Sequence, residues 1–285
     1  MNDGDRIVEL ENTPEALEML GAQRELYRRA KTYQYVAWAL GVVVPIMVTL
    51  MELILSWQIP SQATIAIEMG LFVGVALAQK KKSSLVEDAA AVQQRFDSKV
   101  YGIYFDHVYR DDAEITTLSK MDSGLNYVGR PLEDWYDAGI VGLAPSQAIA
   151  RCQRINATWS GDLSRLTLRM AFLAIVAGLA FVIWATLGRG ADLANLCLGF
   201  TFIESLIEIC WDAADNAKAK GLITLSCSGY DLADERNIRM VQDHILEYRR
   251  NPSILVPDAF YTIRRKLDAQ QVSAIAFARD HGGAR

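Results

Sequence analysis

Four long apolar stretches limit the fold of this 285-residue chain more than any other feature. They cover residues 35–57, 63–78, 166–187 and 193–211, and a bilayer core requires about 20 mostly apolar residues in helical form. Only the letters QIPSQ separate the first two stretches, and only GRGAD separates the last two. Because such short links return the chain at once, the pattern predicts an all-α integral membrane protein with four transmembrane helices in two hairpins.

The composition supports this class and excludes others. Charged residues make up 22% of the chain and the mean hydropathy is +0.10, which is typical of a membrane protein with sizeable water-exposed parts. A net charge of −5 argues against a protein that binds nucleic-acid duplexes. The first thirty residues lack the apolar core of a signal peptide, so we expect the first span to remain as an anchor. The four cysteines fit neither a zinc site nor a disulfide framework: Cys152, Cys197, Cys210 and Cys227.

Lysine and arginine near the spans predict the orientation of the chain. They crowd one side of the predicted helices, whereas Arg189 is alone on the other side. Both termini should therefore be cytosolic, with Trp38 and Trp211 at the inner membrane interface. The predicted organisation is a cytosolic N-terminal helix over 1–34, hairpins over 35–78 and 166–211, a mainly helical cytosolic insert over 79–165, and a cytosolic helical tail over 212–285.

The parts outside the spans carry helix signals. Thr13 followed by Pro14 predicts a helix start, with a hydroxyl N-cap and proline at the first helical position. Pro145 predicts another start, for a helix that runs into the third span, whereas residues 102–142 are rich in turn formers. The tail over 237–250 alternates apolar and charged residues at helical period. A coiled-coil-like seam should continue the second span: Leu85, Ala89, Val92 and Phe96.

Carboxylates inside the apolar stretches are the strongest functional signal. Glu204 and Glu208 lie one turn apart on one helix face, and Thr201 extends that face. Glu68 and Glu52 occupy the second and first spans. A carboxylate at membrane depth costs roughly 3 kcal/mol, so such groups face protein or water. These residues either line a cation-selective pore or form hydrogen bonds between packed helices.

Other candidate sites are a pair of small residues and a set of cytosolic arginines. Gly70 and Gly74 form a GxxxG pattern, which allows helices to approach closely in a membrane, within one chain or between copies. Two arginine pairs near aromatic residues could bind phosphates. Alternatively, they only keep their side of the membrane helices in the cytosol and form ordinary surface ion pairs. They are Arg151 with Arg154, and Arg249 with Arg250.

The sequence contains no pattern that predicts catalysis. GxSxG, Walker A and HExxH motifs are absent, and the three histidines have no ligand spacing. We therefore expect no enzyme, no catalytic residue, no metal and no cofactor. An intramembrane enzyme would need a positioned nucleophile or metal. A transporter would be expected to show paired broken helices.

Several sequence blocks resemble a known family. GAQRELYRRAK precedes the first span, QQRFDSKVYGI follows the second, and EDWY lies in the insert. CQRINATWSGDLSRL precedes the third span, and VQDHILEYRRNPSILVPDAFY lies in the tail. In this order around two hairpins they resemble the SMODS-associated four-transmembrane family of pore-forming effectors, over roughly residues 20–261.

The resemblance implies a role in bacterial anti-phage defence of the cyclic-oligonucleotide (CBASS) type. A nucleotidyltransferase encoded nearby would make a cyclic oligonucleotide, and the effector would then breach the inner membrane. The recurring family positions fall here on Gln23, Arg24, Leu26, Tyr27, Phe96, Asp97, Trp135, Tyr136, Gln153, Arg154, Asn156, Gln242, Asp243, Arg249, Pro257, Asp258 and Tyr261.

These observations lead to one main hypothesis and one alternative. The main hypothesis is an inner-membrane, homo-oligomeric pore gated by a cyclic-oligonucleotide ligand, with lipid as its surroundings and no direct contact with DNA or RNA. The alternative is a membrane-anchored scaffold whose glutamates only stabilise helix packing. Candidate residues for messenger binding or cytosolic coupling are Arg24, Tyr27, Trp135, Tyr136, Arg151, Gln153, Arg154, Asn156, Arg249 and Arg250.

Overall fold

The computed structural model describes residues 3–55, 60–105, 111–122, 132–136, 138–189, 205–219, 221, 223, 234–250 and 255. Within these residues the chain forms helices and no strand, which confirms the predicted all-α class. The helices are α1 (Asp3–Glu11), α2 (Pro14–Trp38), the π-helix η1 (Ala39–Val43), α3 (Val44–Leu55), α4 (Ser61–Tyr101), α5 (Asp112–Met121), the short 3₁₀-helix η2 (Ala138–Ile140), α6 (Pro145–Arg189) and α8 (Glu235–Arg250). Residues 205–219 form a further helix.

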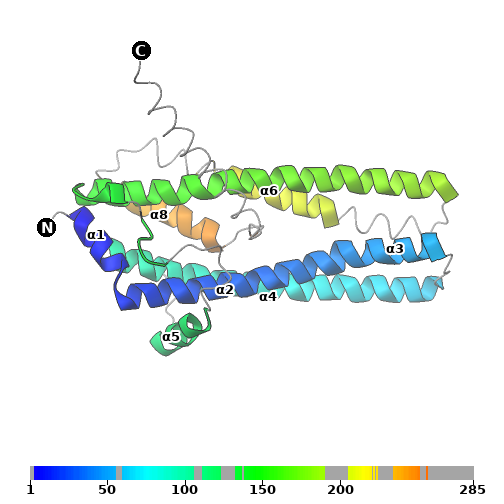
Figure 1. Ribbon diagram of the computed structural model, residues 1–285, viewed down its shortest axis with the longest axis horizontal. Helices are drawn as coiled ribbons and strands as arrows, with labels where there is room; N and C mark the ends of the chain where they lie inside the picture. The colour runs from blue at the N-terminus through cyan, green and yellow to red at the C-terminus, as the bar shows by residue number, and fades with distance from the viewer. Residues whose placement is uncertain are drawn as a thin grey trace, which may run out of the picture.

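The helices form an elongated bundle with two different ends (Figure 1). α2, η1 and α3 continue one another and run alongside α4, while α6 extends along the opposite side. The short helices α1, α5 and α8 gather at one end of this bundle. We call that end the cytosolic end and the other the apolar end, in keeping with the topology that the sequence predicts.

The cytosolic end contains the main hydrophobic core. The predicted seam on α4 is buried there, from Leu85 to Phe96, and it packs in one cluster with Leu20 and Leu26 of α2. Phe96 is only 1% exposed. This part of the chain therefore folds like a water-soluble helical domain, with apolar side chains inside.

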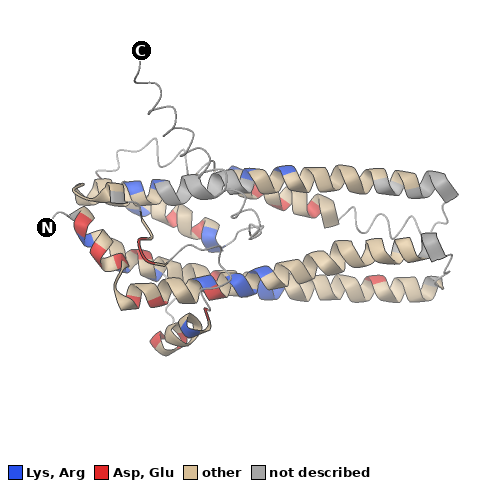
Figure 2. Cartoon of the chain, in the orientation of Figure 1, with Lys and Arg blue, Asp and Glu red and all other residues tan. Residues whose placement is uncertain are grey.

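At the apolar end the pattern is reversed. Large apolar side chains are exposed on α4 and α6, among them Phe72 (75%) and Trp184 (62%). Figure 2 shows that this part of the bundle carries almost no charged residue. Such a surface is unfavourable in water, because exposed apolar area is penalised at about 25 cal/mol per Å². The apolar end is therefore suited to lipid.

One described helix meets the length and composition of a membrane span. It is the Gln62–Tyr101 part of α4, and only 11% of its most apolar window is buried inside the molecule. A core helix of a soluble protein would be mostly buried, so its exposure favours a membrane-spanning role. The arrangement in four spans stays a prediction.

Pro45 lies just after a π-helix in the first predicted span. Proline has no N–H for the carbonyl of Gly41, one turn earlier, and its ring clashes with that carbonyl. The chain widens instead over η1, and the Val44 N–H donates to the Ala39 carbonyl, five residues back. A β-carbon on Gly41 would lie 2.9 Å from the Ser205 hydroxyl oxygen. Glycine therefore allows the helix over 205–219 to approach η1 closely.

Two details differ from the sequence predictions. Residues 1–34 contain two helices rather than one. Thr13 ends the turn that follows α1, and its hydroxyl oxygen caps α2 by accepting a hydrogen bond from the Ala16 N–H at 3.4 Å. The turn-rich part of the insert contains α5, whose N-cap Asp111 accepts from the Ala113 N–H at 3.0 Å. The buried side chains of Ile115 and Leu118 give α5 its apolar face. Such short helices have too few turns for their periodicity to stand out.

Candidate functional site

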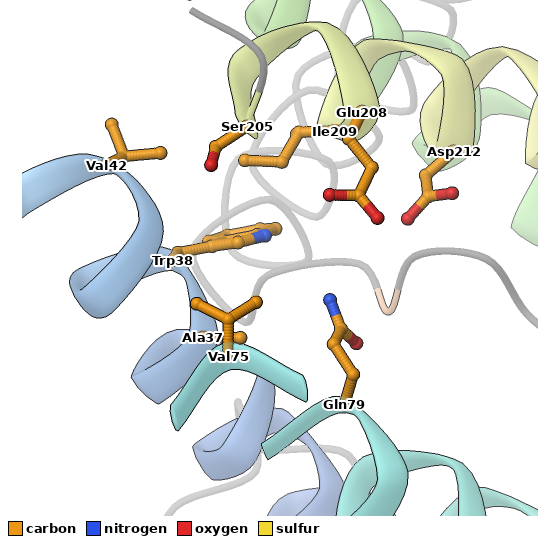
Figure 3. Close-up of a pocket in the computed structure, with 9 residues that line it drawn as sticks. All are labelled: Ala37, Trp38, Val42, Val75, Gln79, Ser205, Glu208, Ile209 and Asp212. Atoms are coloured by element: carbon orange, nitrogen blue, oxygen red, sulfur yellow. The ribbon is translucent and has the colours of Figure 1, made fainter. Parts of the chain in front are cut away.

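A pocket lies where α2 and η1, α4 and the helix over 205–219 meet, and we call it the inner pocket (Figure 3). Its empty volume is about 290 Å³, which includes space open to solvent. The carboxylates of Glu208 and Asp212 and the amide of Gln79 point into the same space. The full lining is Ala37, Trp38, Val42, Val75, Gln79, Ser205, Glu208, Ile209 and Asp212.

Helical spacing brings these side chains together. Glu208 and Asp212 are four residues apart and therefore lie on one face of their helix. Val75 and Gln79 have the same relation on α4. Gly74 supports the close approach of α4 to η1, since a β-carbon there would lie 2.9 Å from Leu40 Cδ1. The GxxxG pattern thus serves packing within the chain at Gly74, whereas at Gly70 no atom of a neighbouring described residue lies within 4 Å of the corresponding position.

A lysine and two carboxylates set the charge at the cytosolic side of the inner pocket. Lys82 is only 6% exposed, and its burial lowers the pKa of the ammonium group, against the opposing effects of Asp212 and Glu208. Burial raises the pKa of Asp212 to about 6; Lys82 opposes this rise, and Glu208 and Asp215 add to it. The pocket therefore carries acidic groups at the edge of the apolar end, and the buried Lys82 lies close enough to act on their charge.

A second polar site lies inside the cytosolic core, centred on Asp97 of α4. Asp97 is 1% exposed and accepts hydrogen bonds from three side chains of two other segments, the stretch over 132–136 and α8. Tyr136 Oη donates to Oδ1 at 3.1 Å, Gln242 Nε2 to Oδ2 at 2.7 Å, and Arg249 Nη1 to Oδ2 at 2.5 Å. Burial opposes the charge on Arg249, but the neighbouring Asp97 carboxylate raises the pKa of the guanidinium above its usual value. Both groups are therefore held as a buried ion pair.

Further buried amides and hydroxyls extend this site on both sides. Gln242 Nε2 also donates to Gln94 Oε1 at 2.9 Å, and Gln153 Nε2 donates to Gln242 Oε1 at 3.1 Å. On the other side the Tyr101 and Tyr136 hydroxyls lie 2.7 Å apart, and burial raises the pKa of both phenols well above the usual range. We call this set the polar network: Gln94, Asp97, Tyr101, Tyr136, Gln153, Gln242 and Arg249.

The structure buries several candidate messenger-binding residues and exposes others. Tyr136, Gln153 and Arg249 are buried in the polar network, where they donate to Asp97 or Gln242. Arg151 and Arg154 are exposed on α6. The remaining described candidates are half-buried or paired. Arg24 forms an ion pair with Asp122, whereas Tyr27 and Trp135 pack against the main core. Arg250 is half-buried, and its buried Nε has no hydrogen-bond partner among the described residues.

The predicted intramembrane residues are placed only in part. Glu208 lines the inner pocket, whereas Glu68 lies elsewhere on α4, half-buried, with one buried carboxylate oxygen that has no hydrogen-bond partner. Glu204 and Thr201 lie outside the described residues, as do the side chains of Glu52 and Asn156.

Sequence reasoning missed Gln79 and Asp212 as members of the inner pocket, and it missed the burial of the nearby Lys82. The sequence does place Gln79 on the same α4 face as Glu68, which was a usable signal. Lys82 is one of the basic residues that predict the orientation of the chain, and periodicity does not show that it is buried near Glu208 and Asp212.

The described part of the chain contains no cluster of metal-ligating side chains, and its fully buried thiol is unreactive. Those residues contain no group of three or more histidine, cysteine, aspartate or glutamate side chains able to hold a metal ion. Cys152 is a free cysteine, and burial raises the pKa of its thiol far above the usual value, so it is inert as a nucleophile.

A helical bundle with a lipid-suited end and a water-suited end is the architecture of a membrane-associated helical protein. The chain belongs to the family described as the SMODS-associating 4TM effector domain, whose model matches residues 5–277. The family expected from the sequence blocks is thus confirmed. A Bacillus cereus (strain VD146) protein named "Probable CBASS effector molecule" is 22% identical over 293 residues, covering 94% of this chain and 96% of that protein. No solved structure matches the chain.

Proposed function

We propose that this protein is the membrane effector of a CBASS-type anti-phage system. A cyclic-oligonucleotide messenger made by a nucleotidyltransferase would cause it to form or open a homo-oligomeric pore in the bacterial inner membrane, with both termini in the cytosol. The family membership and the name of the Bacillus relative support the defence role. The inner pocket is the observation that carries the pore part of the proposal, because it places carboxylates at the edge of the apolar end.

The cytosolic end supplies two kinds of residue for the response to a messenger. Arg151 and Arg154 are exposed on α6, and a guanidinium group matches the geometry of phosphate oxygens. The buried members of the polar network, such as Arg249, are better suited to transmit a change between helices than to contact a ligand directly. A messenger that binds one arrangement of these helices more tightly than the other would shift the population toward it.

Ion flux from proteoliposomes tests the proposal directly. The full-length protein is reconstituted and exposed to a panel of cyclic di- and trinucleotides, with linear nucleotides as controls. We expect one cyclic messenger to trigger flux. Absence of flux with every compound, in protein shown to be folded and inserted, would instead favour the scaffold alternative, in which the glutamates only hold helices together.

Asp212 should give the proposed pore a pH dependence. A carboxyl group loses its charge below its pKa, which burial raises to about 6 in Asp212. Cation preference should therefore fall as the cytosolic-side pH decreases from about 7 to about 5. Reversal potentials in planar bilayers measure this preference. Asp212→Asn should conduct with little change over that range; a wild-type pH dependence in this variant would assign the titration to another group.

A further inference from the structure

The C-terminal segment contacts the cytosolic continuations of all four predicted spans. It binds α4 and α6 through the polar network. Gln242 reaches both helices, donating to Asp97 of α4 at 2.7 Å and accepting from Gln153 of α6 at 3.1 Å. α4 continues the second predicted span into the cytosol, and α6 leads into the third. One side chain of α8 therefore joins two membrane hairpins.

The same segment packs on the continuation of the fourth predicted span. Val241 and Ile245 of α8 form a buried cluster with Ile223, which lies twelve residues beyond the end of the predicted span at 211. Val241 is 0% exposed and Ile245 5%. This contact is apolar and separate from the polar network, so the two can be altered independently.

A contact after α8 reaches the first predicted span. Gln34 of α2, which directly precedes that span, donates from Nε2 to the Leu255 carbonyl at 2.7 Å. It accepts in return from the Leu255 N–H at Oε1, also at 2.7 Å. Gln34 is 1% exposed, and this reciprocal pair resembles the pairing of two strands. Leu255 is thus fixed beside the start of the first predicted span.

We infer that α8 and Leu255 act as a clamp that holds the cytosolic ends of the four membrane helices in the resting protein. Release of this clamp would let the helices that form the inner pocket move apart. Its polar contacts suit it to release, because buried polar groups regain hydrogen bonds from water or a ligand when they separate. The inference rests on the proposed function for its biological meaning, but the mechanical coupling can be measured without any pore activity.

Alkylation of Cys210 reports the coupling. This free cysteine lies on the helix over 205–219, half-buried against the cluster that includes Ala171 of α6. N-ethylmaleimide would be applied to the full-length protein in vesicles, and mass spectrometry would follow the Cys210 peptide. The buried Cys152 in the same sample reports whether the cytosolic core remains folded.

Two variants weaken the clamp at separate places. Val241→Ala with Ile245→Ala loosens the contact with Ile223, and Gln34→Ala removes both hydrogen bonds to Leu255. We expect each to speed Cys210 alkylation about tenfold, with Cys152 still protected, because local opening becomes more populated. Glu247→Ala changes an exposed residue of α8 and should alkylate at the wild-type rate.

The outcomes separate the clamp from the pore. Faster Cys210 alkylation in the variants would support the clamp. If the same variants, reconstituted without a messenger, show no ion flux, the result counts against the pore. Faster hydrogen exchange in α8 with Cys210 alkylation unchanged would overturn the clamp, even if flux still responds to a messenger. If the double variant at Val241 and Ile245 also exposes Cys152, the result for Gln34→Ala decides whether the clamp exists. That variant leaves the apolar contact between α8 and Ile223 intact.

Discussion

Replacing Arg249 with alanine is expected to destabilise the protein more than any other single change considered for the cytosolic end. The substitution leaves the Asp97 carboxyl group, which is 1% exposed, without its charged partner. Loss of one partner of a buried ion pair typically costs about 3–5 kcal/mol. For a chain of this size the apparent melting temperature should fall by about 6 °C or more. Thermal unfolding of the detergent-solubilised protein measures the change.

Two further variants identify the cause of that loss. Arg236→Ala removes an exposed arginine from the same helix and should shift the melting temperature by less than about 2 °C. Combining Arg249→Ala with Asp97→Ala removes both charges, so its cost should be smaller than the sum of the two single costs. Equal shifts for Arg249→Ala and Arg236→Ala, or strict additivity in the double variant, would show that the buried pair is not a stabilising unit.

Much of the fold follows from local signals in the sequence. The seam from Leu85 to Phe96 is buried as its period predicts, because a helix with one apolar stripe must cover that stripe. The starts at Thr13 and Pro145 also agree with the structure, since capping depends on only a few neighbouring residues. Such features are encoded within one or two helical turns, and a single sequence is sufficient to find them.

The polar network could not be assembled from the same signals. Asp97 and Arg249 are 152 residues apart, and periodicity shows which face of a helix is apolar but not which helix covers it. The resemblance did name both residues, together with Tyr136, Gln153 and Gln242, without showing that they meet. Their burial now gives a physical reason for those residue types: a carboxylate in the core needs several donors. The inner pocket was partly missed for the same reason, because Gln79 and Asp212 come from different helices that lie far apart in the sequence.

The largest functional effect is expected from neutralising the paired glutamates of the fourth predicted span. Glu208 lines the inner pocket beside Asp212, and Glu204 precedes it by one turn in the sequence. A unit charge about 4 Å from an ion in water contributes about 1 kcal/mol, or roughly fivefold in relative permeability. Glu204→Gln with Glu208→Gln should therefore reduce the preference for cations over anions by about tenfold or more, measured as a reversal-potential shift in bilayers.

Membrane insertion and a matched glutamate make that experiment decisive. Glutamine keeps the size and hydrogen-bonding capacity of glutamate, so the variant should float with vesicles and resist alkaline extraction as the wild type does. Glu87→Gln alters an exposed glutamate on α4 beyond the inner pocket and should leave selectivity unchanged. If the double variant conducts with wild-type selectivity and remains toxic to cells, the glutamates do not line the conduction path. They would then serve helix packing, where a neutral amide can take the place of a carboxyl group.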